Sequence, residues 1–333
     1  MGTILSMKNI TKIYPGVVAL DDVSIDIEEG ELMAICGENG AGKSTLLKIL
    51  AGAINKTAGT IYFQGKKVDI NNPHDAKKHG ISIIYQELNL NPNLNIAENI
   101  LLGQEPSKGG IIKRKDVYAR AREICDKLNI SYDLKTKVGD LSVAQMQMVE
   151  IAKAISWDAR LLIMDEPTAS LTSVEIDALF NTIKVLKAQG VTIIYISHRL
   201  EEVFQIADRV TVFRDGKLID TKQIGKIDKQ GLVKMMVGRE ISEVKHTYRD
   251  RGDLVLEVKN ITVGDRVKNV SFKAYKNEIL GFSGLVGAGR TELMRAVFGA
   301  DKFDSGEIFM HGKKVKINSI RSAIKNGLSL IHI

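Results

Sequence analysis

Residues 37–45, GENGAGKST, have the composition and spacing of a loop that binds phosphate. Three glycines in the loop let the backbone turn its N–H groups toward phosphate oxygens without Cβ clashes. The Lys43 ammonium can then reach the β- and γ-phosphates of a nucleotide, and the Ser44 hydroxyl can coordinate Mg²⁺. The predicted phosphate-binding residues are Gly37, Glu38, Asn39, Gly40, Ala41, Gly42, Lys43, Ser44 and Thr45.

Two carboxylates that follow an apolar run are suited to complete such a site. In RLLIMDEP, residues 160–167, four apolar residues directly precede Asp165 and Glu166. This pattern predicts a buried strand that delivers both carboxylates to the edge of a sheet. We assign Asp165 to Mg²⁺, directly or through water, and Glu166 to the general base that polarises the attacking water. A third apolar run, 191–197, ends at His198. A histidine in this position is more often structural, but after the two preceding motifs it is a candidate sensor of γ-phosphate.

The phosphate-binding loop needs a strand before it and a helix after it. ELMAIC, residues 31–36, is an apolar run suited to a buried strand, in which Cys36 packs as a small hydrophobe. STLLKILAG, residues 44–52, has helical spacing and ends at a glycine cap. The sequence therefore predicts an α/β fold with a mixed sheet around this loop.

The composition excludes several other classes of protein. The chain has 333 residues, 44% of them hydrophobic and 26% charged, as in soluble globular proteins. It has no apolar run as long as a membrane span and no signal-peptide core at its start. Its two cysteines form no metal-ligand spacing. The net charge of +7 is spread along the chain, which favours a solvated basic surface over a dedicated nucleic-acid site.

The chain also contains an internal repeat. GTIYFQGKKVDI at 59–70 recurs as GEIFMHGKKVKI at 306–317, and glycines match at the same offset of 247 positions. We predict a first domain at 1–238, a linker at 239–253 and a partial second domain at 254–333. The phosphate-binding loop recurs as GLVGAGRTEL, in which an arginine replaces the lysine. The second-loop residues are Gly284, Gly289, Arg290 and Thr291.

Together these motifs closely resemble those of the ATP-binding subunits of ABC transporters. GENGAGKST resembles the Walker A motif and LLIMDE the Walker B motif. IIYQE carries the glutamine of the Q-loop, Gln86, which the resemblance makes a ligand of ATP and Mg²⁺. ASLT at 169–172 is similar to the D-loop, and His198 matches the H-loop histidine. The resemblance further implies that Tyr14 stacks on adenine.

LSVAQMQMVEIAKAI at 141–155 resembles the signature motif and its helix. The signature residues are Leu141, Ser142, Val143, Ala144 and Gln145. Two of them, Val143 and Ala144, replace the glycines of the familiar motif. Ser142 and the start of the helix, which meet γ-phosphate in the family, are retained.

The doubled architecture and the second loop resemble importers of ribose, galactose, xylose and related monosaccharides. This resemblance implies a subunit that hydrolyses ATP, with Mg²⁺ as cofactor, to drive sugar uptake. Its partners would be integral-membrane permease subunits and, through them, a sugar-binding protein, with no nucleic acid. It would be peripheral, on the cytoplasmic face of the cell membrane.

The family arrangement also implies that two ABC domains meet head to tail, so that each loop is completed by the other domain's signature. Arg290 keeps the charge of a lysine, but its planar fork is too bulky for the same cradle. We therefore expect weak or non-hydrolytic nucleotide binding at the second loop. The chain ends where the second Q-loop would begin, as a fragment or as a truncated gene product, and the strand expected at 328–333 would fray.

A mostly helical subdomain is expected at about 90–157. Within it, NLNIAENILLGQEP at 93–106 is where the family docks its membrane subunit. We expect exposed apolar residues there, including Ile100 and Leu101, whose charged variants would uncouple transport.

Two other functions compete with sugar import. A soluble ABC ATPase that acts on nucleic acid or in translation would suit the basic charge, but would carry zinc cysteines, a coiled-coil insertion or a long basic linker. An inactive structural domain conflicts with the intact Lys43, Asp165 and Glu166.

Overall fold

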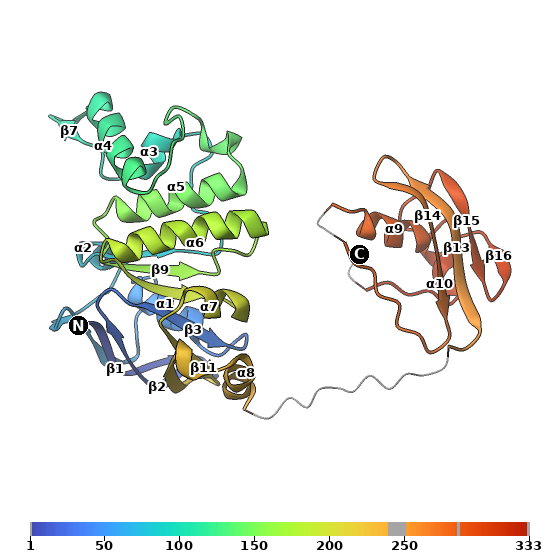
Figure 1. Cartoon of the computed structure of the whole chain (residues 1–333), viewed down its shortest axis with the longest axis horizontal. Helices are drawn as coiled ribbons and strands as arrows, with labels where there is room; N and C mark the ends of the chain where they lie inside the picture. Colours follow the sequence, from blue (N-terminus) through green and yellow to red (C-terminus); the bar gives the residue numbers. More distant parts are fainter. Residues whose placement is uncertain (1, 239–250, 285–286, 332–333) are drawn as a thin grey trace. The chain divides into compact units, whose positions relative to one another are not determined.

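The computed structural model describes residues 2–238, 251–284 and 287–331 of the chain. The chain divides into two compact units, Met1–Ser242 and Glu243–Ile333 (Figure 1). Most of the predicted linker, residues 239–250, lies outside the described residues. No helix in the described ranges is long and apolar enough to cross a lipid bilayer.

The first unit contains a mixed sheet of six strands that carries the candidate chemistry. Its order is β12-β11-β3-β10-β9-β6, and all neighbouring pairs are parallel except β11 with the edge strand β12. The strands are β3 (Leu32–Gly37), β6 (Ile81–Ile84), β9 (Leu161–Asp165), β10 (Thr192–Ile196), β11 (Arg209–Arg214) and β12 (Lys217–Gln223). The predicted α/β fold is therefore confirmed.

Both faces of this sheet are covered, which explains why its strands are continuous apolar runs. Along β3, Ala34 and Cys36 face one hydrophobic cluster, while Met33 and Ile35 face another. Burial raises the pKa of the Cys36 thiol to about 12, which keeps it protonated. The packing helices of this unit are α1 (Lys43–Leu50), α2 (Pro73–Lys78), α6 (Ser173–Ala188), α7 (Leu200–Ile206) and α8 (Lys229–Val237), with short 3₁₀ turns at Val138–Asp140 and Ile224–Lys226.

A second, antiparallel sheet packs against one face of this layer. Its order is β2-β1-β4-β5, with β1 (Thr3–Tyr14), β2 (Val17–Glu28), β4 (Ala58–Phe63) and β5 (Lys66–Val68). Leu5, Met7 and Ile10 of β1 are fully buried and belong to the same cluster as Met33 and Ile35 of β3. The antiparallel sheet therefore covers the face of β3 that carries Met33 and Ile35, and the two sheets share one hydrophobic core.

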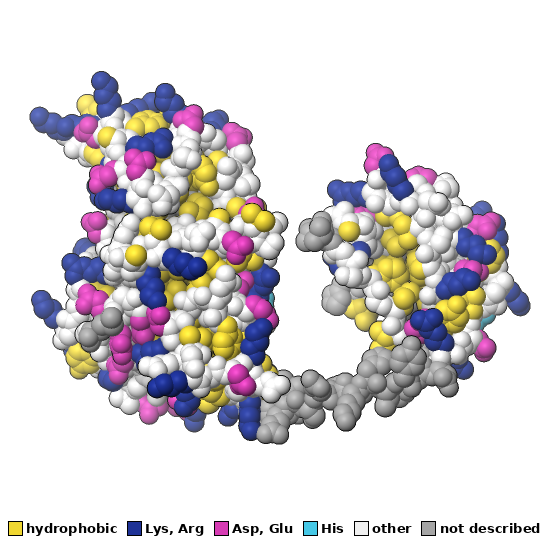
Figure 2. Space-filling model, viewed as in Figure 1, with side chains coloured by type: hydrophobic (Ala, Val, Ile, Leu, Met, Phe, Trp, Pro, Cys, Tyr) yellow, Lys and Arg dark blue, Asp and Glu magenta, His cyan; other side chains and the backbone are white. Residues whose placement is uncertain are grey.

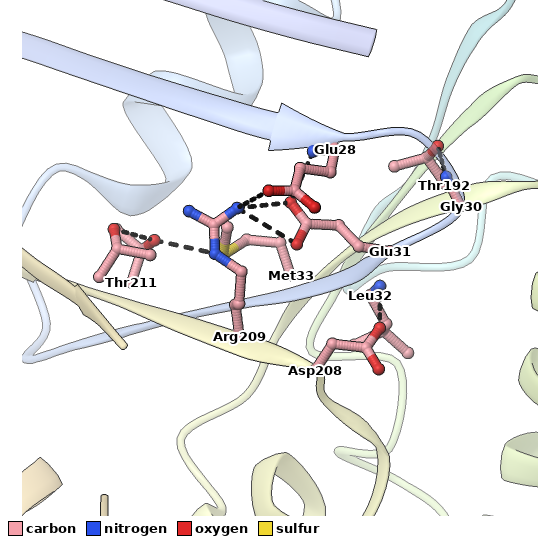
Figure 3. Close-up of polar contacts among 10 residues, drawn as sticks. Glu28, Gly30, Glu31, Leu32, Met33, Thr192, Asp208, Arg209 and Thr211 are labelled. Carbon is pink, nitrogen blue, oxygen red and sulfur yellow. Dashed lines mark hydrogen bonds and ion pairs between the residues drawn. The ribbon is translucent and has the colours of Figure 1, made fainter. Parts of the chain in front are cut away.

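A polar network holds the starting ends of three parallel strands in place (Figure 3). Arg209 Nη1 donates to both carboxylate oxygens of the buried Glu31, at 3.2 and 3.3 Å. The Asp208 carboxylate accepts from Leu32 N at 2.8 Å, and Thr192 Oγ1 accepts from Gly30 N at 2.9 Å. These contacts join β3, β10 and β11 at the end of the sheet opposite the loop at 37–45.

A mostly helical segment lies at one end of the first unit (Figure 1). It contains α3 (Ile96–Ile100), the hairpin strands β7 (Ser107–Lys108) and β8 (Ile111–Ile112), α4 (Arg114–Lys127) and α5 (Val143–Ile155). Asn95 starts α3 with a capping box, in which its side chain accepts from Glu98 N and the Glu98 carboxylate accepts from Asn95 N. Ser142 caps α5 in the same way with Gln145.

The expectation that Ile100 and Leu101 are exposed for docking is wrong. Both side chains are fully buried and pack in the cluster that joins α3, α4 and α5 to the six-stranded sheet. A short amphipathic helix turns its apolar residues inward, and sequence spacing alone does not say which neighbours cover them. Leu102, at 41% exposure, is the large apolar side chain of this stretch that reaches the surface.

We predict that Ile100→Asp lowers the free energy of unfolding by more than about 3 kcal/mol, because it places an unpaired charge in the core. Urea denaturation followed by circular dichroism measures this change. The matched control is Leu102→Asp, which should change stability by less than about 1 kcal/mol. Equal stability of the two variants would contradict the core assignment and restore a docking role for Ile100.

The second unit repeats the antiparallel part of the first. Its sheet has the order β14-β13-β15-β16, equivalent to β2-β1-β4-β5. Its elements are β13 (Leu254–Val263), β14 (Val267–Tyr275), α9 (Arg290–Val297), β15 (Ser305–Met310), β16 (Lys313–Val315) and α10 (Ile320–Lys325). A Cβ on Gly42 would lie 2.7 Å from Ala19 O, and a Cβ on Gly289 would lie 2.9 Å from Arg266 O. These partners are equivalent under the repeat offset, so the repeat extends to close backbone packing.

The strand expected at 328–333 is not formed over its described part, residues 328–331. Residues 278–284, which correspond to β3, are likewise not a strand, and Ile279 is 96% exposed. In the first unit, β3 and β6 each pair with a parallel neighbouring strand. The described part of the second unit supplies no parallel strand that could pair with residues 278–284 or 328–331. Hydrophobic side chains are accordingly visible on the surface of the second unit in Figure 2.

Candidate functional site

The loop between β3 and α1 has a backbone that glycine alone accommodates at two positions. Gly37 has φ +156°, and a Cβ there would lie 2.3 Å from Phe213 O on β11. Gly42 has φ +100° and is the N-cap of α1. These two residues let the loop pass between neighbouring backbones and present the N-terminal N–H groups of α1 to a ligand.

We predict that Gly37→Ala destabilises the protein by about 1–3 kcal/mol and disrupts the loop, because the added methyl group overlaps a backbone carbonyl. Thermal or urea unfolding measures the loss of stability. Gly225→Ala is the control, since a Cβ at that glycine meets nothing within 4 Å and its φ is not in the left-handed region. Unchanged stability and unchanged nucleotide binding in Gly37→Ala would show that the loop relaxes freely.

Lys43 lies folded over the same loop. Its Nζ donates to Gly37 O at 2.8 Å and to Glu38 O at 2.9 Å. Burial lowers the pKa of Lys43, while the nearby Glu166, Cys36 and Asp165 act in the opposite direction. The ammonium group is therefore partly desolvated and held at the mouth of the loop, where a phosphate can replace the two carbonyl oxygens as its partner.

Register in the parallel sheet brings the acidic pair to the same end as the loop. Asp165 pairs with Ile196 of β10, and Ile196 in turn pairs with Ile35 of β3. Burial, and after it the charge of Glu166, raise the pKa of Asp165, whereas Lys43 and Lys48 lower it. The predicted strands around these residues are thus confirmed as β9 and β10.

Glu166 has an unusual backbone conformation and contacts the predicted histidine. Its φ is +48°, a left-handed value that costs a residue with a side chain about 1–3 kcal/mol and is concentrated at functional sites. Its Oε1 lies 3.3 Å from His198 Nδ1, and the His198 side chain is 64% exposed. The structure therefore brings together two residues that are separated by a whole helix in the sequence.

One cavity of about 620 Å³ joins most of the predicted residues, a size typical of small-ligand sites. The predicted residues that line it are Asn39, Gly40, Ala41, Gly42, Lys43, Ser44, Thr45, Gln86, Asp165 and Glu166. Gly37, Glu38, Tyr14, His198 and the signature residues 141–145 do not line it. Tyr14 lies at the end of β1, with Lys12 Nζ 4.9 Å from its ring centroid.

Several lining residues were not predicted from the sequence. They are Val17, Val18, Ala19, Ile196, Asp215 and Gly216. Val17 and Val18 are 60% and 51% exposed, and they give the cavity an apolar wall at the start of β2. Asp215 and Gly216 form the two-residue turn between β11 and β12, with φ +50° and +76°. An Asp-Gly pair between apolar runs is a recognisable hairpin signal, but it does not say that the turn reaches a loop 170 residues earlier.

The oxygen ligands that the cavity offers fit Mg²⁺ bound together with a nucleotide. Ser44, Gln86 and Asp165 offer a hydroxyl, an amide oxygen and one carboxylate. The described residues contain no cluster of three or more His, Cys, Asp or Glu side chains able to hold a metal by themselves. A site with few protein ligands is the usual case for Mg²⁺, which takes one or two carboxylates and completes its shell with phosphate oxygens and water.

The signature segment contains the N-terminus of helix α5. Ser142 Oγ accepts from Gln145 N at 3.3 Å, and Val143 is 45% exposed. The N-terminus of α5 is therefore accessible on the surface of the first unit.

The second loop keeps only part of the first loop's geometry. Gly289 has φ +80° and caps α9, which starts at Arg290, as Gly42 caps α1. Arg290 and Thr291 are exposed. Residues 285–286 of this loop lie outside the described part of the chain.

Comparison with known proteins shows the family to which the chain is similar. A family model described as "ABC transporter" matches residues 20–169 and 267–332. The chain is 46% identical over 332 residues to the ribose import ATP-binding protein RbsA 3 of Rubrobacter xylanophilus, covering 99% of this chain and 67% of the relative. It is 48% identical over 342 residues to the xylose import ATP-binding protein XylG of Thermoanaerobacter pseudethanolicus, covering 98% and 67%.

Solved structures show the same similarity over the first unit. A nucleotide-free ATP-binding cassette from an ABC transporter matches with a TM-score of 0.64 and 30% identity, covering 72% of this chain and all of that one. A dimeric cassette bound to ADP and Pi matches with a TM-score of 0.58 and 27% identity, covering 66% of this chain and 98% of that one. The chain spans about two thirds of the length of its curated relatives, from 63% to 67% in the matches of highest similarity. These matches, together with the fold and the site, show that the chain belongs to the ABC transporter family.

Proposed function

We propose that this protein is the ATP-hydrolysing subunit of an importer for a monosaccharide of the ribose, galactose or xylose type. The observation that carries the proposal is the cavity in which the loop with Lys43 faces the pair Asp165 and Glu166. The names of the relatives supply the class of cargo. No residue of the described chain is assigned to the sugar.

The residues of the cavity divide the work of phosphoryl transfer to water. Lys43 and the loop N–H groups stabilise the β- and γ-phosphates, where negative charge develops. Ser44, Gln86 and Asp165 would hold Mg²⁺, which would neutralise phosphate charge. Glu166 accepts a hydrogen bond from the attacking water and takes its proton, and His198 contacts the γ-phosphate from the exposed side.

The proposed partners are a second ABC domain, membrane subunits and a sugar-binding protein, as the resemblance to monosaccharide importers implies. The accessible signature end at Ser142 closes over the loop of a second ABC domain in a head-to-tail arrangement. Integral-membrane permease subunits and a sugar-binding protein complete the importer, with this subunit peripheral on the cytoplasmic face of the membrane. In this scheme residues 1–238 are the catalytic domain, 90–157 its helical subdomain, and 254–333 part of a second domain. Arg290 leaves that second domain with weak or non-hydrolytic nucleotide binding.

Uptake of labelled sugars in cells that lack the gene tests the proposal. Uptake of at least one of ribose, galactose and xylose should fall, and the wild-type gene should restore it. A Lys43→Ala gene should not restore it, although the protein is made in equal amount. Unchanged uptake of all three sugars would reject monosaccharide import, and restoration by Lys43→Ala would reject ATP as the energy source.

A further inference from the structure

A buried carboxylate beside the site, Glu202 on α7, is not part of the nucleotide cavity. Its side chain is 5% exposed, and three hydroxyl groups donate to one of its oxygens, Oε2. The donors are Ser197 Oγ at 2.8 Å, Tyr195 OH at 2.9 Å and Thr168 Oγ1 at 2.9 Å. Its other oxygen, Oε1, lies 3.1 Å from Arg199 Nη1.

These four partners belong to the two segments that carry Glu166 and His198. Thr168 lies two residues after Glu166, in the turn that follows β9. Ser197 and Arg199 flank His198 on either side, and Ser197 Oγ also accepts from Arg199 N at 3.0 Å. One carboxylate therefore joins the segment of the general base to the segment of the histidine.

The network is built so that the carboxylate is the common acceptor. Burial, and after it the negative charge of Glu202, raise the pKa of Tyr195 far above its ordinary value, so the phenol stays a donor. Ser197 and Thr168 are 3% and 2% exposed, so water has little access to their hydroxyl groups. If Glu202 were removed, each hydroxyl would lose its acceptor. Hydrogen bonds to an ionised group are the stronger kind, and buried hydroxyls without a partner are costly.

The conformation of Glu166 needs such a support. Its left-handed backbone, at φ +48°, persists only where neighbouring contacts determine it, and Glu166 N donates to Ile196 O at 3.0 Å. The 3.3 Å contact between Glu166 Oε1 and His198 Nδ1 then depends on how the two segments are held relative to each other.

We propose that Glu202 is a positioning residue, which sets the distance between Glu166 and His198 by holding both of their segments on a single carboxylate. The proposal rests on the ATPase function argued above. Because Glu202 does not line the cavity, its loss should leave the binding of ATP intact and lower the rate of the chemical step. A misplacement of about 1 Å at a reacting group can cost about 10²-fold in rate.

Steady-state ATPase assays of matched variants of the full chain test this inference. Glu202→Gln keeps the shape and one acceptor oxygen, so kcat should fall by about 10-fold, and Glu202→Leu should lower it by about 100-fold. The Kd for ATP should change by less than about 3-fold in both, and circular dichroism should report folded protein. Glu201→Gln is the control, because Glu201 is the neighbouring glutamate on α7, has a 74% exposed side chain, and should leave kcat unchanged.

A double-mutant cycle separates positioning from a general loss of stability. If Glu202 acts through the pair of Glu166 and His198, Glu202→Gln in a His198→Ala background should change kcat by less than about 2-fold. The full loss of rate in that background, or a wild-type kcat in folded Glu202→Gln and Glu202→Leu, would overturn the inference. Failure of the wild-type chain to hydrolyse ATP, even at concentrations at which two chains pair head to tail, would instead reject the proposed function.

Discussion

Replacing Lys43 by alanine is expected to lower kcat/KM for ATP hydrolysis by a factor of at least about 10²–10³. The ammonium group is held by the two loop carbonyls at 2.8 and 2.9 Å, on the wall of the cavity in which we propose that the terminal phosphates bind. Alanine removes a positive charge that no other residue of the loop can supply. Burial lowers the pKa of this lysine. The same burial reduces the screening of its charge by water, so the ammonium group interacts more strongly with a phosphate.

Steady-state hydrolysis and the binding of a fluorescent ATP analogue measure this effect. Lys66→Ala, an exposed lysine on β5, is the control and should match the wild type. Lys43→Arg gives the first loop the residue found in the second loop. It should keep part of the binding and lose most of the turnover, because the planar guanidinium does not fit the narrow cradle. Hydrolysis by Lys43→Ala at the wild-type rate would contradict the assignment of this loop.

Glu166→Gln is expected to abolish most of the turnover while ATP remains bound. Glutamine has the same shape, but it cannot accept the proton of the attacking water, and general bases typically contribute about 10²–10⁴-fold. The substitution also removes a negative charge that raises the pKa of Asp165, which favours the ionised form of the carboxylate that we propose as a ligand of Mg²⁺. The result should be a protein that traps ATP.

Single-turnover assays and retention of labelled ATP on a filter distinguish loss of chemistry from loss of binding. Glu29→Gln, an exposed glutamate in the turn after β2, is the isosteric control. Turnover near the wild-type rate in Glu166→Gln would move the role of base to another group. Loss of ATP binding would mean that Glu166 acts mainly through the fold, with its left-handed backbone as the cause.

Local patterns predicted the elements of the site well. The apolar runs at 31–36, 160–165 and 191–197 became β3, β9 and β10, and the helix after the first loop became α1. These elements are short-range consequences of hydrophobic periodicity and of glycine and helix-capping chemistry. The internal repeat was equally clear, because the segment 59–70 recurs at 306–317 and glycines match at the same offset. The structure adds that Gly42 and Gly289 make equivalent close backbone contacts.

Packing over long sequence separations could not be predicted in the same way. Ile100 and Leu101 had the apolar character of a docking surface, but the helical segment turns them into the core. Val17 and Gly216 line the cavity because β2 and the hairpin of β11 and β12 pass over the loop, and neither belongs to a motif that would suggest this. In the sequence, Glu202 is an ordinary glutamate of a helix, and its enclosure between two strand ends is a result of the fold.

Local sequence patterns were enough to identify the side chains available for phosphoryl transfer and the strand or helix that carries each of them, because backbone preferences act over a few residues. The packing of the folded chain places Asp165, His198 and Lys43 at the same end of one sheet, because the parallel register of β3, β10 and β9 aligns those ends. The packing also shows that residues 278–284, despite their likeness to β3, form no strand. A buried parallel strand must pair its backbone N–H and C=O groups with a neighbouring strand, and the described second unit supplies no parallel partner.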